Sequence, residues 1–175
     1  MTKSPDIRVP KGISTQEPRF TFGEVVTATG ADELWFRSLL QRDRSSAIGT
    51  KDKRLGRLMF SFDDVMQVAL IHSLNAFAKI PPQSAREICA VALSVWANMD
   101  QPSLNTDLHV GFSDDGRPLV WTIADGVVTT WSDAADEALE AAKMYLSSRR
   151  PHITFNMEWL YEAPLRATMA AERGV

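Results

Sequence analysis

The chain has 175 residues, of which 45% are hydrophobic and 23% are charged, and its formal net charge at pH 7 is −3. This composition is typical of a globular protein and leaves room for one domain or two small ones. No run of about 18 apolar residues predicts a transmembrane helix, and the polar, proline-containing start does not resemble a secretory signal. The single cysteine, Cys89, excludes an intrachain disulfide and favours a buried, inert thiol. We therefore expect a cytoplasmic protein.

Positive charge is concentrated in the first third of the chain. Residues 1–60 carry 11 Lys/Arg and 7 Asp/Glu, whereas residues 61–175 carry 8 and 15. Between positions 37 and 57 there are seven basic residues and two acidic ones. A solvated surface patch is the simple alternative, but the cluster coincides with a predicted helix and the hairpin after it, which favours contact with a phosphate backbone.

The chain begins with a predicted flexible arm over residues 1–18, which contain three prolines and a glycine. A short helix is then predicted over residues 22–29, with Thr21 as its N-cap and Gly30 as its stop. Asp32 is a suitable N-cap for a second helix of about ten residues. Two short helices joined by a tight, glycine-containing turn predict a helix-turn-helix.

A two-stranded hairpin with a charged tip is predicted next, because small and polar residues with Gly49 and Gly56 lie between apolar positions at Ile48 and residues 58–60. Ser61 and Asp64 then form a capping-box-like start to a long apolar helix. The order of helix, turn, helix, hairpin and helix predicts a winged helix-turn-helix.

In this part the sequence resembles the MerR family of DNA-binding regulators. The resemblance lies in four segments in the family's order and spacing: the run from Phe20 to Val26, Thr29-Gly30, Phe36-Arg37, and the run from Gly56 to Val65. It covers about residues 19–88. Ser38-Leu39 replaces an aromatic pair of the family, Arg57 is displaced by one position, and the hairpin is longer than usual. The resemblance implies a winged helix-turn-helix that binds double-stranded DNA as a dimer, and it implies that Arg37 contacts phosphate.

Further candidate DNA-binding residues follow from the pattern itself. Glu33 and Trp35 lie early on the second helix, where base edges or thymine methyls are met; packing of Trp35 on the hairpin is the structural alternative. Basic residues on the second helix and hairpin are expected to contact the DNA backbone. Thr21, at the start of the first helix, is also a candidate. The basic candidates on the second helix and hairpin are Arg42, Arg44, Lys51, Lys53, Arg54 and Arg57.

The remaining chain predicts two more helices and a small α+β module. Helices are expected over residues 62–79 and 83–99, the second buried on more than one side and a candidate for part of a dimer contact. After a polar loop at 100–107, alternation predicts strands around 108–112, 119–123 and 127–131, a helix over 132–148, a strand over 153–159 and a short helix over 165–172. The fold class is thus mainly α, of α+β type. The expected domains are residues 19–100 and a dimerisation or effector module at 105–175.

We found no pattern that predicts an enzyme, a cofactor or a metal site. The three histidines lie far apart without motif partners, and Asp114-Asp115-Gly116 is read as a hairpin turn. Tryptophans at positions 121, 131 and 159 are expected in a core or an interface, with a ligand pocket as the alternative. The leading hypothesis is a dimeric, nucleoid-associated transcriptional regulator of bacterial or phage type, with RNA polymerase or another regulator as a further partner. The alternatives are an excisionase-like architectural factor and a protein-interaction adaptor.

Overall fold

The computed structural model describes residues 16–42, 48–51, 56–98, 107–112, 118–124, 127–130, 143 and 153–173. Within these residues the fold is mixed α+β with helices predominating. The helices are α1 (Phe22–Thr29), α2 (Glu33–Arg42), α3 (Phe62–Ala76), α4 (Pro82–Asn98) and α6 (Met157–Arg173). The strands are β1 (Thr50–Lys51), β2 (Leu58–Met59), β3 (Asp107–Phe112), β4 (Pro118–Ala124), β5 (Val127–Thr130) and β6 (Ile153–Asn156).

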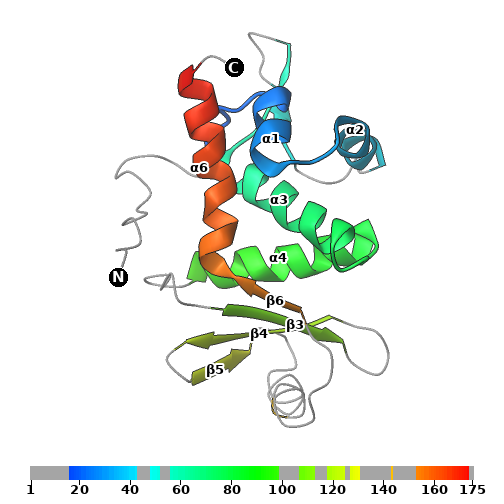
Figure 1. Ribbon diagram of the computed structural model, residues 1–175, viewed down its shortest axis with the longest axis vertical. Coiled ribbons are helices and arrows are strands. Elements are labelled where there is room, and N and C mark those ends of the chain that lie inside the picture. The colour runs from blue at the N-terminus through cyan, green and yellow to red at the C-terminus, as the bar shows by residue number, and fades with distance from the viewer. Residues whose placement is uncertain are drawn as a thin grey trace.

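The molecule has a helical part and a sheet part, with α4 between them (Figure 1). The sheet is antiparallel, with strand order β5-β4-β3-β6. α4 packs on α3 on one side and on β4 on the other, which confirms the prediction that this helix is buried on more than one side. Cys89 on α4 is fully buried, and burial raises the pKa of its thiol, as expected for an inert core cysteine.

Local sequence signals determine where α1 begins and ends and where α2 begins, as predicted. Thr21 caps α1 in a capping box with Glu24, and Gly30 ends the helix in the left-handed conformation at φ 66°. α2 begins after Asp32, whose side chain accepts a hydrogen bond from the Trp35 backbone N–H at 2.9 Å. An N-terminal cap and a left-handed glycine satisfy the backbone groups that each helix end leaves without partners.

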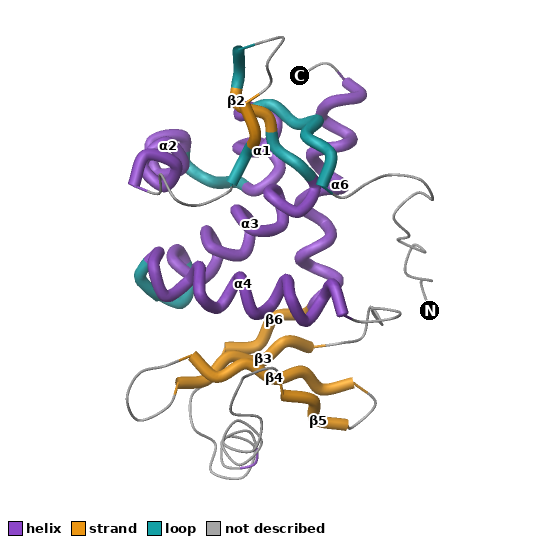
Figure 2. The backbone as a smooth tube through the Cα atoms, turned by 180° about the vertical axis from the view of Figure 1, so that it is seen from behind, coloured by secondary structure: helices purple, strands orange, loops and turns teal. Residues whose placement is uncertain are grey.

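The predicted hairpin is formed by β1 and β2, which pair antiparallel with Thr50 opposite Met59. Phe20 adds a bridge to Phe60, so the segment before α1 lies beside the hairpin. Figure 2 shows β2 next to α1 at the end of the molecule that is remote from the four-stranded sheet. Ser61 and Asp64 then form the expected capping box at the start of α3.

The hairpin contains a glycine that another residue cannot easily replace. Gly49 has φ 81°, and a Cβ added there would lie 2.9 Å from Phe60 Cε1. We expect Gly49→Ala to lower the free energy of unfolding by about 1–3 kcal/mol, because it combines left-handed backbone strain with a steric clash. Gly23→Ala is the matched control, because no atom lies within 4 Å of the added Cβ, and it should raise stability by about 0.5–1 kcal/mol inside a helix. Urea denaturation of both variants measures the difference, and equal midpoints would contradict this account of the hairpin.

The C-terminal part differs from the prediction where strand β6 ends and helix α6 begins. Alternation over residues 153–159 predicted a strand, but β6 ends at Asn156 and α6 begins at Met157, so the prediction for residues 157–159 was wrong. The short helix expected from position 165 is a longer one with Pro164 inside it. Proline usually marks a helix boundary because it lacks a backbone N–H, and here tertiary packing overrides that preference: Ala163 and Ala167 are buried in the core.

α6 returns to the N-terminal helices. It packs on α1 and α3 and runs from the sheet to the far end of the helical part (Figure 1). Arg166 Nε donates a hydrogen bond to the Ala28 carbonyl, 3.1 Å away, near the end of α1. A cation there suits the negative end of the helix dipole. One hydrophobic cluster joins all these elements, from Val25 and Phe36 to Leu108 and Ala167. Residues 100–106 of the boundary loop predicted at 100–107 lie outside the described residues, and Asp107 is the first residue of β3. Most of the predicted helix at 132–148 also lies outside them; Lys143 within that range is helical.

Candidate functional site

A groove lies between the start of α1, the second half of α2 and strand β2. Its volume is about 450 Å³. We call it the basic groove, and the residues that define it are Thr21, Gly23, Arg37, Gln41, Arg57 and Leu58. The groove thus brings together three of the predicted site residues (Thr21, Arg37 and Arg57) from three different elements.

The capping box determines the shape of one wall. Thr21 Oγ1 accepts a hydrogen bond from the Glu24 backbone N–H at 3.4 Å, and Glu24 Oε2 accepts one from the Thr21 backbone N–H at 2.6 Å. These bonds hold the first turn of α1 at the groove, and the Glu24 carboxylate offsets part of the positive end of the helix dipole there. Thr21 is therefore a structural cap whose position also places it at the candidate site.

Arg37 is held over an aromatic stack. Its guanidinium carbon lies 4.6 Å from the centre of the Phe22 ring. Phe22 stacks on Phe36 at 4.9 Å, and Phe36 contacts Phe60 at 5.4 Å. A guanidinium over a ring face is attracted by the ring quadrupole and keeps its charge. The stack therefore orients Arg37, whose side chain remains more than half exposed.

The arginines of the groove are not neutralised by carboxylates of the described chain. Arg37 lies 3.8 Å from Glu33 one turn away, with both side chains more than half exposed, and an exposed pair of this kind is weak. Arg57 is exposed and has no ion-pair partner among the described residues. The groove is thus an open, positively charged surface.

Trp35 lies away from the basic groove, against α3. Its indole N–H donates to Asn75 Oδ1 at 3.2 Å, and its ring meets His72 edge-on at 5.0 Å. The ring therefore packs on α3 rather than on the hairpin, and its donor is used within the protein. Burial lowers the pKa of His72, which favours its neutral imidazole.

The other candidate residues are more dispersed. Glu33 is exposed beside Arg37, and Arg42 lines a different pocket on the other side of α2. Lys51 lies in β1. Arg44, Lys53 and Arg54 lie outside the described residues, as do the side chain of Lys51 and the Asp114-Asp115-Gly116 turn.

Two residues on the outward face of α2 were missed from the sequence. Leu34 is 77% exposed. Gln41, which lies about two helical turns later on the same side of α2, is also exposed. The signal was available: positions 34 and 41 share a helix face, and Phe36 and Leu39 occupy the buried one. If α2 enters the major groove of DNA, Leu34 and Gln41 are the side chains that project from this helix together with Arg37.

In the sheet, Trp121 is a core residue. It is fully buried and stacks on His109 at 5.6 Å with an interplanar angle of 7°. His109 Nδ1 lies 3.1 Å from Thr154 Oγ1. This arrangement accords with the expectation of a core aromatic at position 121. Trp131 and the side chain of Trp159 lie outside the described residues.

Comparison with models of known protein families and with curated proteins found no match for this chain. Within the described residues, no helix combines the length and apolarity needed to cross a bilayer. No group of three or more metal-ligating side chains occurs in that same part of the chain.

Proposed function

We propose that this protein is a sequence-specific regulator of MerR-like type that binds double-stranded DNA as a dimer. In this proposal α1 and α2 form the helix-turn-helix, α2 enters the major groove, and the β1–β2 hairpin is the wing on the backbone. The observation that carries the proposal is the basic groove: Arg37 and Arg57 both line it beside the first turn of α1, and among the described residues their only ion pair is the exposed one between Arg37 and Glu33. This is the chemistry that recognises a phosphate.

The charge distribution supports the same function. The positive charge lies in residues 1–60, while the rest of the chain is acidic. A surface of this kind attracts DNA to the N-terminal end and repels it from the other. A single unit of this size reads only a few base pairs, so a regulator needs two copies on a two-fold site.

The experiment that tests the proposal is selection of duplex DNA from a genomic fragment library with the purified full chain. The selected and scrambled duplexes are then titrated by fluorescence anisotropy over a range of salt concentrations. We expect the selected duplex to bind at least about 10³-fold more tightly than the scrambled one, with affinity falling steeply as salt increases. Binding that shows no sequence preference would instead favour the architectural, excisionase-like alternative.

A protein-interaction adaptor is the second candidate, because the exposure of Leu34 is compatible with it as well as with DNA binding. A leucine that is 77% exposed on the outward face of α2 suits either a thymine methyl or an apolar protein surface. Absence of any duplex binding at low salt, together with no retention on heparin, would rule out the DNA-binding proposal and leave the adaptor.

A further inference from the structure

A second pocket lies on the other side of α2 from the basic groove. It has a volume of about 540 Å³ and is formed where the C-terminal half of α2 meets the end of α3 and the start of α4. We call it the Trp–Pro pocket, after the residues that define it: Trp35, Arg42, Asn75, Pro81, Pro82 and Arg86. Pockets of about 300–1,000 Å³ are the size that binds small molecules.

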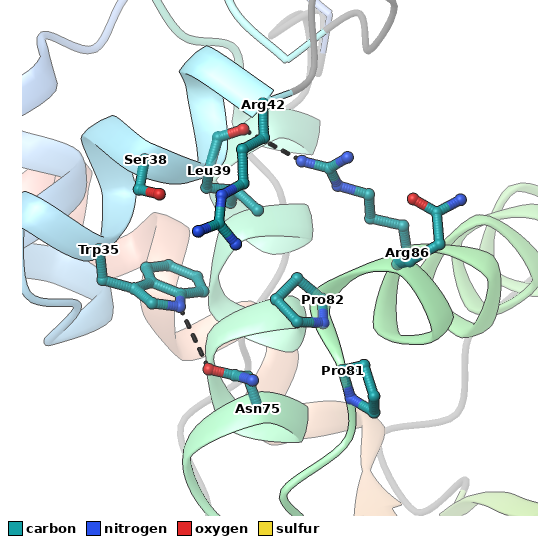
Figure 3. Close-up of a pocket in the computed structure, with 9 residues that line it drawn as sticks. Trp35, Ser38, Leu39, Arg42, Asn75, Pro81, Pro82 and Arg86 are labelled. Carbon is teal, nitrogen blue, oxygen red and sulfur yellow. Dashed lines mark hydrogen bonds between the residues drawn. The ribbon is translucent and has the colours of Figure 1, made fainter.

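The walls of this pocket are apolar and flat. Figure 3 shows the Trp35 indole on one side and the Pro81 and Pro82 rings on the other. The indole is fixed by its hydrogen bond to Asn75 Oδ1, and Asn75 Nδ2 in turn donates to the Ile80 carbonyl at 3.0 Å. The wall is therefore already in place before any ligand binds. A space between an indole and proline rings suits a planar, aromatic group.

One end of the pocket is cationic. The guanidinium groups of Arg42 and Arg86 both lie there (Figure 3). Arg86 donates a hydrogen bond to the Leu39 carbonyl at 3.1 Å, which ties α4 to α2. Arg42 has no hydrogen-bond or ion-pair partner among the described residues. None of the described residues that line the pocket is acidic, so no carboxylate of the described lining competes for Arg42.

From this geometry we propose that the Trp–Pro pocket binds a small aromatic carboxylate. The ring lies between Trp35 and the two prolines, and the carboxylate accepts charge-assisted hydrogen bonds from Arg42. Arg86 supplies additional positive charge while it holds α2 to α4. A ligand in this position contacts both helices, so it stabilises the orientation of α2 relative to α4. The inference does not require DNA binding and is tested without DNA.

The test uses the full chain and 4-fluorobenzoate, followed by ¹⁹F NMR line broadening, with 4-fluorobenzamide as the neutral isostere. We expect saturable binding of the acid with a dissociation constant on the order of 1 mM, as is usual for a ligand of this size. The amide should bind at least about tenfold more weakly, because it has no negative charge and only one acceptor oxygen, so it cannot form a bidentate ion pair with Arg42. Equal binding of acid and amide, or no saturable binding of the acid, would overturn the proposal.

Three variants locate the site. Arg42→Gln removes the cation and should weaken binding of the acid at least about tenfold. Arg57→Gln is the matched control in the basic groove and should leave binding unchanged; an equal loss in both variants would show a general field effect and contradict the proposal. Ser38→Phe, at another residue that lines the pocket, places a ring inside it and should abolish binding by steric exclusion. Acid binding that Ser38→Phe leaves intact would place the ligand elsewhere.

Discussion

Replacement of both Arg37 and Arg57 by Ala is expected to weaken binding of the dimer to every duplex sequence by roughly 10³-fold at about 0.15 M salt. The estimate comes from counterion release, in which each lost phosphate contact lowers the slope of log affinity against log salt by about 0.9. The two arginines of each subunit make four contacts in the dimer, and their loss lowers the slope by roughly 3.6, which corresponds to the stated loss relative to about 1 M salt. Anisotropy titrations at four or more salt concentrations measure both quantities.

The matched control removes two cations from other places. Lys79 lies after α3, and Lys143 is exposed in the second half of the chain. The variant Lys79→Ala with Lys143→Ala changes net charge by the same amount, so a difference between the two double variants reports local contacts and not the overall field. An unchanged salt slope in the Arg37 and Arg57 variant would remove both residues from the interface while leaving open the involvement of other parts of α2.

Phe36→Ala is expected to lower the free energy of unfolding by about 3–5 kcal/mol, a large part of the usual stability of a domain. Phe36 is fully buried and is the middle ring between Phe22 and Phe60. Its removal leaves a cavity where α1, α2 and the hairpin meet. Phe22 also loses its support, and with it the ring beneath Arg37. The variant should therefore weaken DNA binding even under conditions where it remains folded.

The control for this variant is Phe77→Ala. Phe77 is 82% exposed just after α3, so the same chemical change should alter stability by no more than about 0.5 kcal/mol. Urea denaturation of both variants gives the comparison. Similar losses at the two positions would mean that the aromatic stack does not hold the basic groove together.

Where local chemistry determined the structure, the sequence was sufficient. The limits of α1 follow from Thr21 and Gly30, and the start of α3 follows from Ser61 and Asp64. Each boundary depends on a cap within three residues or on a left-handed glycine, so it can be recognised without knowledge of the rest of the fold. The predicted strands β3, β4 and β5 were found for the same reason, since alternation and turn residues are local signals.

The candidate site was less predictable because it depends on direction and on distant partners. Arg37 and Arg42 carry the same charge on the same helix, but five residues rotate a side chain by roughly 140° around the axis. The structure accordingly places Arg37 in the basic groove and Arg42 in the Trp–Pro pocket. Trp35 was a candidate for contact with DNA, and no local signal indicated its hydrogen bond to Asn75, because Asn75 is 40 residues away in sequence. Similarly, the helix predicted over residues 165–172 is part of the longer α6, which includes Pro164 and packs on α1 and α3.

The hydrogen bond between Arg166 and Ala28 spans 138 residues of sequence and has a consequence for biosynthesis. The helices that form the basic groove emerge from the ribosome before α6, so the surface of α1 that α6 covers remains exposed until α6 has been translated. Contacts of such long sequence separation form late and slowly. Nascent chains should therefore be unable to complete the packing around α1 until α6 has been synthesised.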